Sequence, residues 1–189
     1  MSLKDQFDIE GLDSTLGYVG RAFAPATSNA VIVDVLKSLG AVVIAKTNLP
    51  QSIMVRPQYL CTAAAIDFLQ WCETENPLWG LTTHPMNPAF TSGGSSGGEA
   101  ALLSSHGSLV GWGTDIGGSI RIPSHMNGLW GLKPSVSCPA SGLTKGNADN
   151  SHFRAVGCRI KACQSLLKVS SMFLLPSALW RGHYLLSPL

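Results

Sequence analysis

Two glycine–serine loops within residues 91–134 limit what this chain can fold into more than any other feature. The first loop is GGSSGG at residues 93–98, and the second is GGS at residues 117–119. Glycine permits positive φ angles and lets a backbone approach a ligand closely. Successive amide N–H groups in such a loop form a concavity that favours negative charge. A serine in each loop therefore indicates a nucleophile set beside an oxyanion site.

Length and composition narrow the class of protein. The 189 residues are enough for one domain with a sizeable core. Only 13% of the residues are charged, against about 25% in an ordinary globular domain, so the surfaces are either well buried or lack their partners. The net charge is +2 and no basic run occurs, which argues against a nucleic-acid partner.

The cysteines and the hydrophobic stretches bear on the compartment. Five cysteines include no CxxC pair and leave one over, which favours a reducing, cytoplasmic setting over a disulfide framework. The first residues are charged and do not resemble a signal peptide. Residues 172–180, the most apolar late stretch, are far shorter than the roughly 18 residues of a membrane span and contain Pro176.

Alternating helix and strand patterns predict an α/β fold, with a mixed, twisted sheet flanked by helices. Residues 29–39 predict a helix with Asn29 as its N-cap and Gly40 after its end. Its predicted apolar face consists of Ile32, Val35, Leu36 and Leu39. The run AVVIA at residues 41–45 predicts a buried strand. Further expected elements are the end of a strand at residues 3–9, an irregular loop at 76–90, a helix at 99–106, a strand at 109–112 and a helical turn at 123–127.

The glycine–serine loops allow three other interpretations. Phosphate binding is disfavoured because no lysine follows Gly97 or Gly98, and the GxGxxG pattern is incomplete. A GxSxG match at residues 93–97 suggests an α/β-hydrolase nucleophile with Asp115 and His125 or His152 downstream, yet residues 85–92 are not strand-like. A serine–lysine site needs a desolvated lysine, for which both Lys4 and Lys46 remain candidates. The SxxK match at residues 165–168 lies in an unpatterned tail.

The same residues resemble a known family. The run GGSSGGEAALL, followed by GWGTDIGGSIRIPSHMNGLWGLKPS, is similar to the signature of the amidase signature hydrolases. The block NPLWGLTTHPMNPAF resembles the fungal acetamidase and general amidase branch. The upstream blocks SLKDQFDIEGLDSTLG and AVIVDVLKSLGAVVIAKTNLPQS resemble the family as well, so the resemblance covers about residues 2–54 and 76–135.

The resemblance implies a catalytic triad of the form Ser–cis-Ser–Lys. It assigns Lys4 as the base, Ser95 as the bridging serine after a cis peptide bond, and Ser119 as the nucleophile. It also implies oxyanion donors in the backbone N–H groups of Ile116, Gly117, Gly118 and Ser119. Asp115 and Arg121 are expected to form an ion pair that braces the second loop.

The implied function is hydrolysis of small carboxylic amides to acid and ammonia, through an acyl-enzyme on Ser119. The implied chemistry requires no metal or organic cofactor, and the expected partner is a small amide substrate, with a homodimer left open. Two alternatives are an inactive fragment of such an amidase and an amidotransferase-type subunit that passes ammonia to a partner.

The chain also departs from the family pattern. Family members are more than twice as long, so we expect the fold to be incomplete in this chain. Residues 55–75 read as an insertion between two matching blocks. We therefore expect a partial amidase signature domain at residues 1–136 and a divergent, unassigned tail at residues 137–189.

Overall fold

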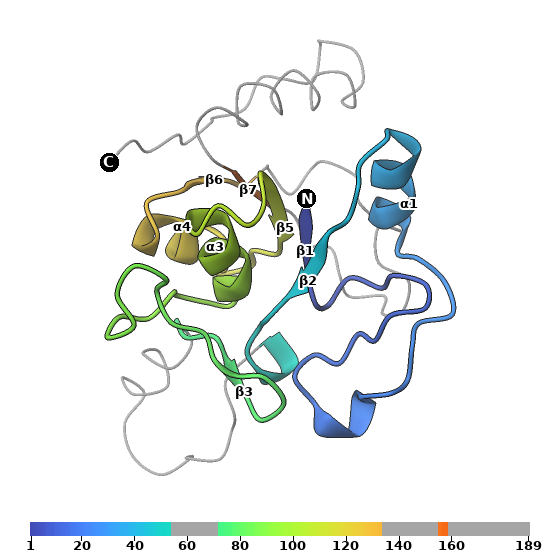
Figure 1. Ribbon diagram of the computed structural model, residues 1–189, viewed down its shortest axis with the longest axis horizontal. Helices are drawn as coiled ribbons and strands as arrows, with labels where there is room; N and C mark the ends of the chain where they lie inside the picture. Colours follow the sequence, from blue (N-terminus) through green and yellow to red (C-terminus); the bar gives the residue numbers. More distant parts are fainter. Residues whose placement is uncertain (54–71, 134–154, 159–189) are drawn as a thin grey trace.

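The computed structural model describes residues 1–53, 72–133 and 155–158, and its centre is a five-stranded mixed sheet (Figure 1). The strands are β1 (Ser2–Lys4), β2 (Ala45–Thr47), β5 (Val110–Gly113), β6 (Trp130–Leu132) and β7 (Ala155–Cys158). Their order is β2-β1-β5-β7-β6. Strand β1 pairs in parallel with β2 and β5, whereas β7 is antiparallel to both β5 and β6. The predicted α/β class with a mixed sheet is confirmed.

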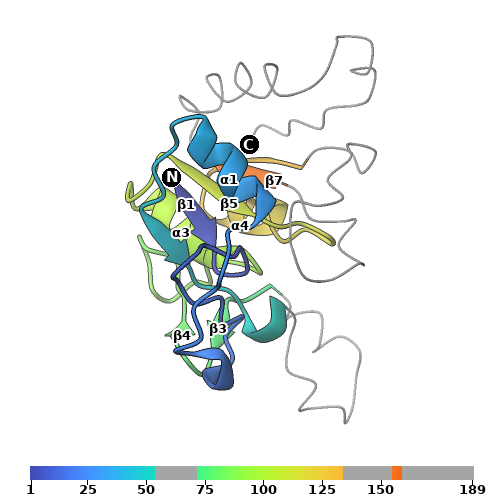
Figure 2. The ribbon, with the colours of Figure 1, turned by 90° about the vertical axis from the view of Figure 1, so that its right-hand side faces the viewer.

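Helices cover the two faces of this sheet. They are α1 (Val31–Ser38), α3 (Gly97–Ser104) and α4 (Arg121–Met126), with short 3₁₀ segments at Val19–Arg21 and Gln51–Ile53. Figures 1 and 2 show α3 and α4 together on one side of the central strands and α1 on the other. Side chains alternate between the two faces of a strand, so Leu3 joins the α1 core whereas Ser2 and Lys4 point to the α3 side.

Helix α1 lies within the range predicted for it, but its cap and its buried face differ from the prediction. Ala30 is the N-cap residue and makes no side-chain capping bond, while Asn29 bonds the Glu10 amide and the Asp34 carboxylate instead. Val33 and Leu36 are the buried residues. Of the predicted face, Leu36 is buried and Ile32 packs against the core, whereas Val35 and Leu39 are 36% and 49% exposed. Gly40 follows the helix with φ +81°, as predicted.

The strand after α1 begins later than the sequence indicates. Residues 41–45 were predicted as a buried strand, but β2 begins at Ala45, and Val42 and Ile44 are 71% and 56% exposed. The cause is register: Ala45 pairs with Ser2, the first residue of β1. Before this pair, the Ile44 N–H and the Val42 carbonyl bond Met1 outside the strand ladder.

Close backbone contacts hold α3 against the strands. A Cβ atom on Gly98 would lie 2.4 Å from the Asn48 nitrogen and 2.5 Å from its carbonyl oxygen. A Cβ atom on Gly111 would lie 2.2 Å from the Glu99 carboxylate. Both glycines are needed because the helix backbone and the buried Glu99 approach β2 and β5 within the space of a methyl group.

The strand end predicted at residues 3–9 was too long, because β1 ends at Lys4, whereas the other predicted elements agree to within a few residues. Helix α3 and strand β5 overlap the predicted helix at 99–106 and strand at 109–112, and α4 overlaps the predicted turn at 123–127. The loop predicted at 76–90 includes part of a small antiparallel hairpin, β3 (Glu75–Asn76) and β4 (Gly80–Leu81). Most of the expected insertion and tail lies outside the described residues, apart from β7. In the described part of the chain, no helix combines the length and apolarity needed to cross a membrane.

Candidate active site

The first glycine–serine loop lies directly beside the end of β1. The Lys4 Nζ atom lies 2.6 Å from the Ser95 Oγ atom, and both side chains are buried. The Gly94–Ser95 peptide bond is cis. Ser95 comes just before α3, whose N-terminal residues pack on the sheet, so the loop presents Ser95 to the carboxyl end of the strand that carries Lys4. The structure therefore brings together two of the three residues predicted to form the triad.

A second hydroxyl holds the Lys4 amine from the neighbouring strand. Thr114, directly after β5, places its Oγ1 atom 2.9 Å from Lys4 Nζ. The Thr114 hydroxyl in turn donates to Gln6 Oε1 at 2.8 Å. Since that proton is committed to Gln6, the Thr114 oxygen accepts from Lys4. This fixes the direction of one Lys4 N–H bond and leaves the Ser95 side of the nitrogen for proton transfer.

The second loop is tied to the first by a backbone hydrogen bond. The Ser96 N–H donates to the Ser119 carbonyl at 3.0 Å. Ser119 is partly exposed, in contrast to the buried Ser95. Among the described residues, no hydrogen bond joins the Ser119 hydroxyl to the Ser95 hydroxyl. The loops are therefore adjacent, while the predicted last link of the proton route remains a prediction.

Asp115 organises the second loop from inside. Its buried carboxylate accepts two bonds from the Arg121 guanidinium, from Nε at 3.0 Å and from Nη2 at 2.9 Å. It also accepts from the backbone N–H groups of Gly118, Ile120 and Arg121. Although burial opposes ionisation, these donors together lower the pKa of Asp115. The predicted bracing ion pair is confirmed.

The same bonds bear on the predicted oxyanion donors. The Gly118 N–H donates to Asp115 Oδ1 at 2.9 Å and is occupied in this structure. Within the described residues, the N–H groups of Ile116, Gly117 and Ser119 have no hydrogen-bond acceptor. Ile116 and Gly117 are exposed. Three of the four predicted donors thus have no acceptor among the described residues, whereas Gly118 secures the loop.

Burial determines the protonation of Lys4. Its side chain is 0% exposed, and desolvation lowers the pKa of Lys4 to about 7, against the opposing pull of Glu99 and Asp115. An exposed lysine ammonium holds its proton to about pH 10.4. Near neutral pH a substantial share of Lys4 is therefore the free amine, which is the form able to take a proton from a serine.

A buried carboxylic acid lies in the same layer. Glu99 in the first turn of α3 accepts from the Ser2 hydroxyl at 2.5 Å and from the Thr47 hydroxyl at 2.6 Å. Burial raises the pKa of Glu99 to about 7, although these bonds and Lys4 oppose the shift. The site thus contains one buried base and one buried acid.

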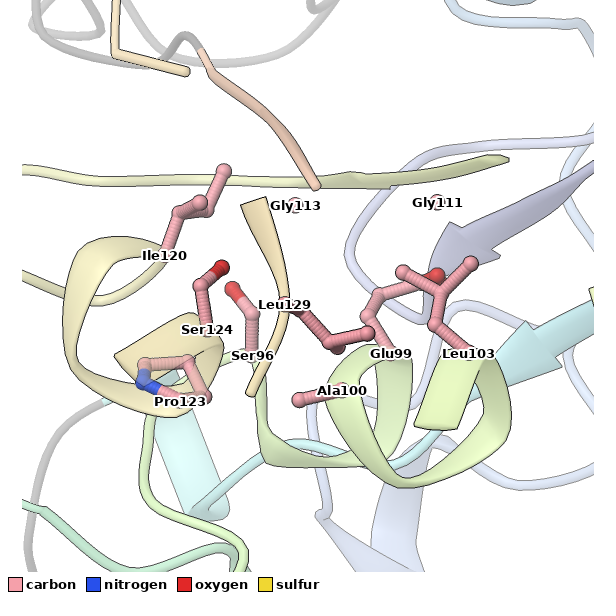
Figure 3. A pocket seen from close by; sticks show the side chains of 10 residues that line it. All are labelled: Ser96, Glu99, Ala100, Leu103, Gly111, Gly113, Ile120, Pro123, Ser124 and Leu129. Atoms are coloured by element: carbon pink, nitrogen blue, oxygen red, sulfur yellow. The ribbon is translucent and has the colours of Figure 1, made fainter. Parts of the chain in front are cut away.

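A small cavity of about 10 Å³ lies behind the first loop, with the Ser96 and Ser124 hydroxyls near each other and Glu99 farther along it (Figure 3). Pockets for small-molecule ligands usually measure about 300–1,000 Å³, so this cavity is not the substrate site. In the described ranges, no group of three or more His, Cys, Asp or Glu side chains has an arrangement suited to a metal ion.

The structure separates the alternatives that the sequence left open. Lys46 points to the face of the sheet opposite to that of Lys4. There it bonds the Asp13 carbonyl and the Ser14 hydroxyl and pairs with Asp5 at 3.6 Å. Lys4, and not Lys46, therefore reaches the serine loop. Asp115 is bound to Arg121, and His125 is exposed, so neither forms the acid–histidine pair of an α/β-hydrolase. His152 and residues 165–168 lie outside the described residues.

The sequence reasoning missed three residues of the site: Gln6, Glu99 and Thr114. Thr114 follows β5 just as Lys4 ends β1, and the carboxyl ends of adjacent parallel strands meet at one edge. That rule would have placed Thr114 beside Lys4. Glu99 is the one charged residue in GGEAALLS, and a lone acid in an otherwise apolar helix indicates a buried partner. No sequence signal distinguishes Gln6.

Together, the parallel strand ends, the paired serine loops and the buried lysine define a serine–lysine type of site on an α/β sheet. A family model described as Amidase matches residues 1–59 and 58–158, and the chain belongs to the amidase signature family. The matched range extends past residue 136, where we placed the start of the divergent tail. The domain boundaries remain a prediction.

Individual relatives support the same placement. The chain is 67% identical over 135 residues to Amidase 1 of Gibberella moniliformis, covering 71% of this chain and 23% of the relative. It is 38% identical over 145 residues to the Acetamidase of Aspergillus oryzae, covering 76% and 24%. The solved structure of 6-aminohexanoate cyclic dimer hydrolase matches with a TM-score of 0.72 and 28% identity, covering 89% of this chain and 33% of that one. The chain thus spans about a quarter of the length of the curated relatives it matches.

Proposed function

We propose that this chain supplies the catalytic centre of an amidase that hydrolyses small carboxylic amides to acid and ammonia. The observation that carries the proposal is the 2.6 Å approach of a fully buried Lys4 amine to the Ser95 hydroxyl. Membership of the family and the fungal amidase relatives support an amide as the substrate class.

In the proposed mechanism, Ser119 is the nucleophile. Its Oγ forms a bond to the amide carbonyl carbon while its proton passes to Ser95, whose own proton passes to neutral Lys4. The Ile116, Gly117 and Ser119 N–H groups stabilise the oxyanion that forms. The proton then returns along the same groups to the leaving nitrogen, the C–N bond breaks, and ammonia departs. Water attacks the resulting ester, which releases the acid and restores Ser119.

The role of each supporting residue follows from its contacts. Thr114 and Gln6 fix one N–H bond of Lys4, and the nitrogen keeps another position for its contact with Ser95. Asp115 and Arg121 hold the second loop in the shape that presents Ser119 and its neighbouring amides. A pre-organised site of this kind needs little rearrangement at the moment of reaction.

A fluorophosphonate probe, which labels activated serines, tests the proposal in the full chain. We expect labelling of the wild type, release of ammonia from acetamide, and loss of both in Ser119→Ala. Ser105→Ala is the matched control, because Ser105 is an exposed serine at the end of α3. Folded protein that neither takes the probe nor releases ammonia would show an inactive fragment. Ammonia release that requires a second protein would favour the amidotransferase alternative.

A further inference from the structure

The buried acid Glu99 has no part in the mechanism above, yet it sits beneath the strand that carries Lys4. Its two carboxylate oxygens are each held by one hydroxyl, from Ser2 on β1 and from Thr47 on β2. Ser2 and Lys4 are two positions apart on β1 and so share a face. Thr47 is the residue that pairs with Lys4 in the sheet. Glu99 is thus bound to both neighbours of the base.

The charges of Lys4 and Glu99 depend on each other, because both side chains are buried. An isolated charge buried away from water carries a large desolvation cost, and buried charges are paired or neutralised. Lys4 and Glu99 are 0% and 4% exposed. Two states of this layer carry no net charge: ammonium with carboxylate, and free amine with carboxylic acid. Only the second contains the form of Lys4 that the proposed function uses.

We propose that Glu99 is a positioning residue that shares a single proton with Lys4 and so sets how much of the base is neutral. In the resting layer the proton lies on the Lys4 nitrogen and Glu99 is anionic, or it lies on the Glu99 carboxyl and Lys4 is neutral. One N–H bond is exchanged for one O–H bond, and nothing else is consumed. The catalytic meaning of this equilibrium rests on the proposed function, but the equilibrium itself does not.

The other charged groups on the elements around Glu99 are the chain's terminal ammonium and groups that are exposed, turned away or paired elsewhere. Met1, just before β1, contributes an ammonium group that bonds the Val42 carbonyl and favours the Glu99 anion. On β2, Lys46 is turned to the opposite face and paired with Asp5. Strand β5 has no titratable residue, and β7 has only Cys158. On α4, His125 is exposed, and Arg121 is paired with Asp115.

The burial of both groups favours their neutral forms, in agreement with the proposal. Desolvation is the largest cause that lowers the pKa of Lys4 and the largest that raises the pKa of Glu99. Each group opposes the shift of the other by its charge. The Glu99 carboxylate stabilises the ammonium form of Lys4, so removal of its charge should lower the pKa of Lys4 further. The titration of a coupled pair belongs to both groups, so the proposal is tested by changing one and observing the other.

The experiment titrates the Lys4 side-chain nitrogen by ¹⁵N NMR in the full chain, without substrate. Lys4→Met identifies its signal by the loss of that signal. We expect Glu99→Gln, which keeps the shape and can still bond both hydroxyls, to lower the Lys4 midpoint by about one pH unit or more. Glu10→Gln, at an exposed carboxylate, is the matched control and should leave the midpoint unchanged. In active protein, the acid limb of the pH–rate profile should move down by the same amount.

A second variant keeps the proposal testable if Glu99→Gln does not fold. Thr47→Val is close in shape and removes one hydroxyl from the Glu99 anion, so the proton should move toward Glu99 and the Lys4 midpoint should fall by a smaller amount. The proposal is overturned if the Lys4 midpoint stays at the wild-type value in folded Glu99→Gln. If only Thr47→Val folds, an unchanged Lys4 midpoint in that variant overturns it. Failure of the amidase function would instead appear as absent probe labelling with the Lys4 shift intact.

Discussion

The Lys4 Nζ atom lies 2.6 Å from the Ser95 Oγ atom, although 91 residues separate the two in sequence. The contact exists because β1 and β5 are parallel neighbours and α3 packs across them, so that the loop before α3 meets the end of β1. Neither side chain is accessible to solvent beyond 1%. A buried lysine that touches a serine hydroxyl is set for proton transfer more than for ion pairing, and the first two predictions follow from this.

Replacement of Lys4 by methionine should reduce amide hydrolysis by about 10²–10⁴-fold, the range typical for the loss of a general base. Methionine fills a similar volume, but its thioether is not basic and cannot take a proton from Ser95. The rate of ammonia release from acetamide measures the effect. Lys37→Met is the control, since Lys37 is exposed on α1. Activity retained in folded Lys4→Met would remove Lys4 from the mechanism.

Hydrolysis should depend on pH with an acid limb near neutrality. Burial lowers the pKa of Lys4 to about 7, and the neutral amine is the active form. Below that pH the neutral fraction falls about tenfold for each unit, whereas above it kcat/KM should reach a plateau. A solvated lysine would reach its plateau only above about pH 10. Circular dichroism at each pH separates this titration from unfolding, and a profile that still rises between pH 8 and 10 would contradict the prediction.

The sequence predicted those parts of the fold that depend on local pattern. Helix α3 and strand β5 follow a glycine-rich start and an apolar run, and both lie within two residues of the predicted bounds. The strand predicted at residues 41–45 was wrong in position, because its register is determined by the distant Ser2. The Asn29 cap was wrong because its side chain bonds Glu10 and Asp34. Tertiary contacts decided both cases.

The residues of the site also fall into those that the sequence could predict and those that it could not. The resemblance named Lys4 and Ser95, whereas the residues alone did not distinguish Lys4 from Lys46. The rule that adjacent parallel strands end at one edge of the sheet could have predicted Thr114, whereas no such rule pointed to Gln6. Glu99 was visible as an odd charge in α3, but its partners Ser2 and Thr47 come from two other elements. Composition cannot show which hydroxyls converge on one carboxylate.

Replacement of Asp115 by asparagine should destabilise the fold and weaken hydrolysis together. The carboxylate accepts five bonds, three of them from Arg121, one through its backbone N–H and two through its guanidinium. A hydrogen bond to a charged group contributes about 1.5–3 kcal/mol. We expect the free energy of unfolding in urea to fall by roughly 2–3 kcal/mol. Glu10→Gln, at an exposed acid, should change it by less than about 0.5 kcal/mol.

The same bonds predict how the loss of stability in Asp115→Asn varies with pH. The hydrogen-bond donors around the Asp115 carboxylate lower its pKa. The ionised carboxylate therefore stabilises the fold above the ordinary aspartate pKa, and this stabilisation is lost as the pH falls through the folded-state pKa. The gap in unfolding free energy between wild type and Asp115→Asn should therefore narrow on acidification. A gap that widens toward low pH would show that Asp115 is protonated in the native state.

Replacement of Gly98 by alanine should disturb the platform on which α3 rests. The added Cβ would lie 2.4 Å from the Asn48 nitrogen and 2.5 Å from its carbonyl oxygen, and backbone atoms cannot rotate away as a side-chain end can. Overpacking of this kind typically costs about 1–3 kcal/mol. Gly20→Ala is the matched control, because a Cβ there meets no atom within 4 Å.

Two measurements read out the Gly98 change. Urea unfolding should show a loss of about 1–3 kcal/mol in Gly98→Ala and a change within about 0.5 kcal/mol in Gly20→Ala. Because Ser95 directly precedes Ser96, the N-cap residue of α3, a shift of the first turn should also move the Ser95 hydroxyl away from Lys4. Probe labelling of Ser119 should therefore fall in Gly98→Ala even at temperatures where the variant is fully folded. Equal stability and labelling in the two variants would mean that α3 can move away from Asn48 without disturbing the serine loop.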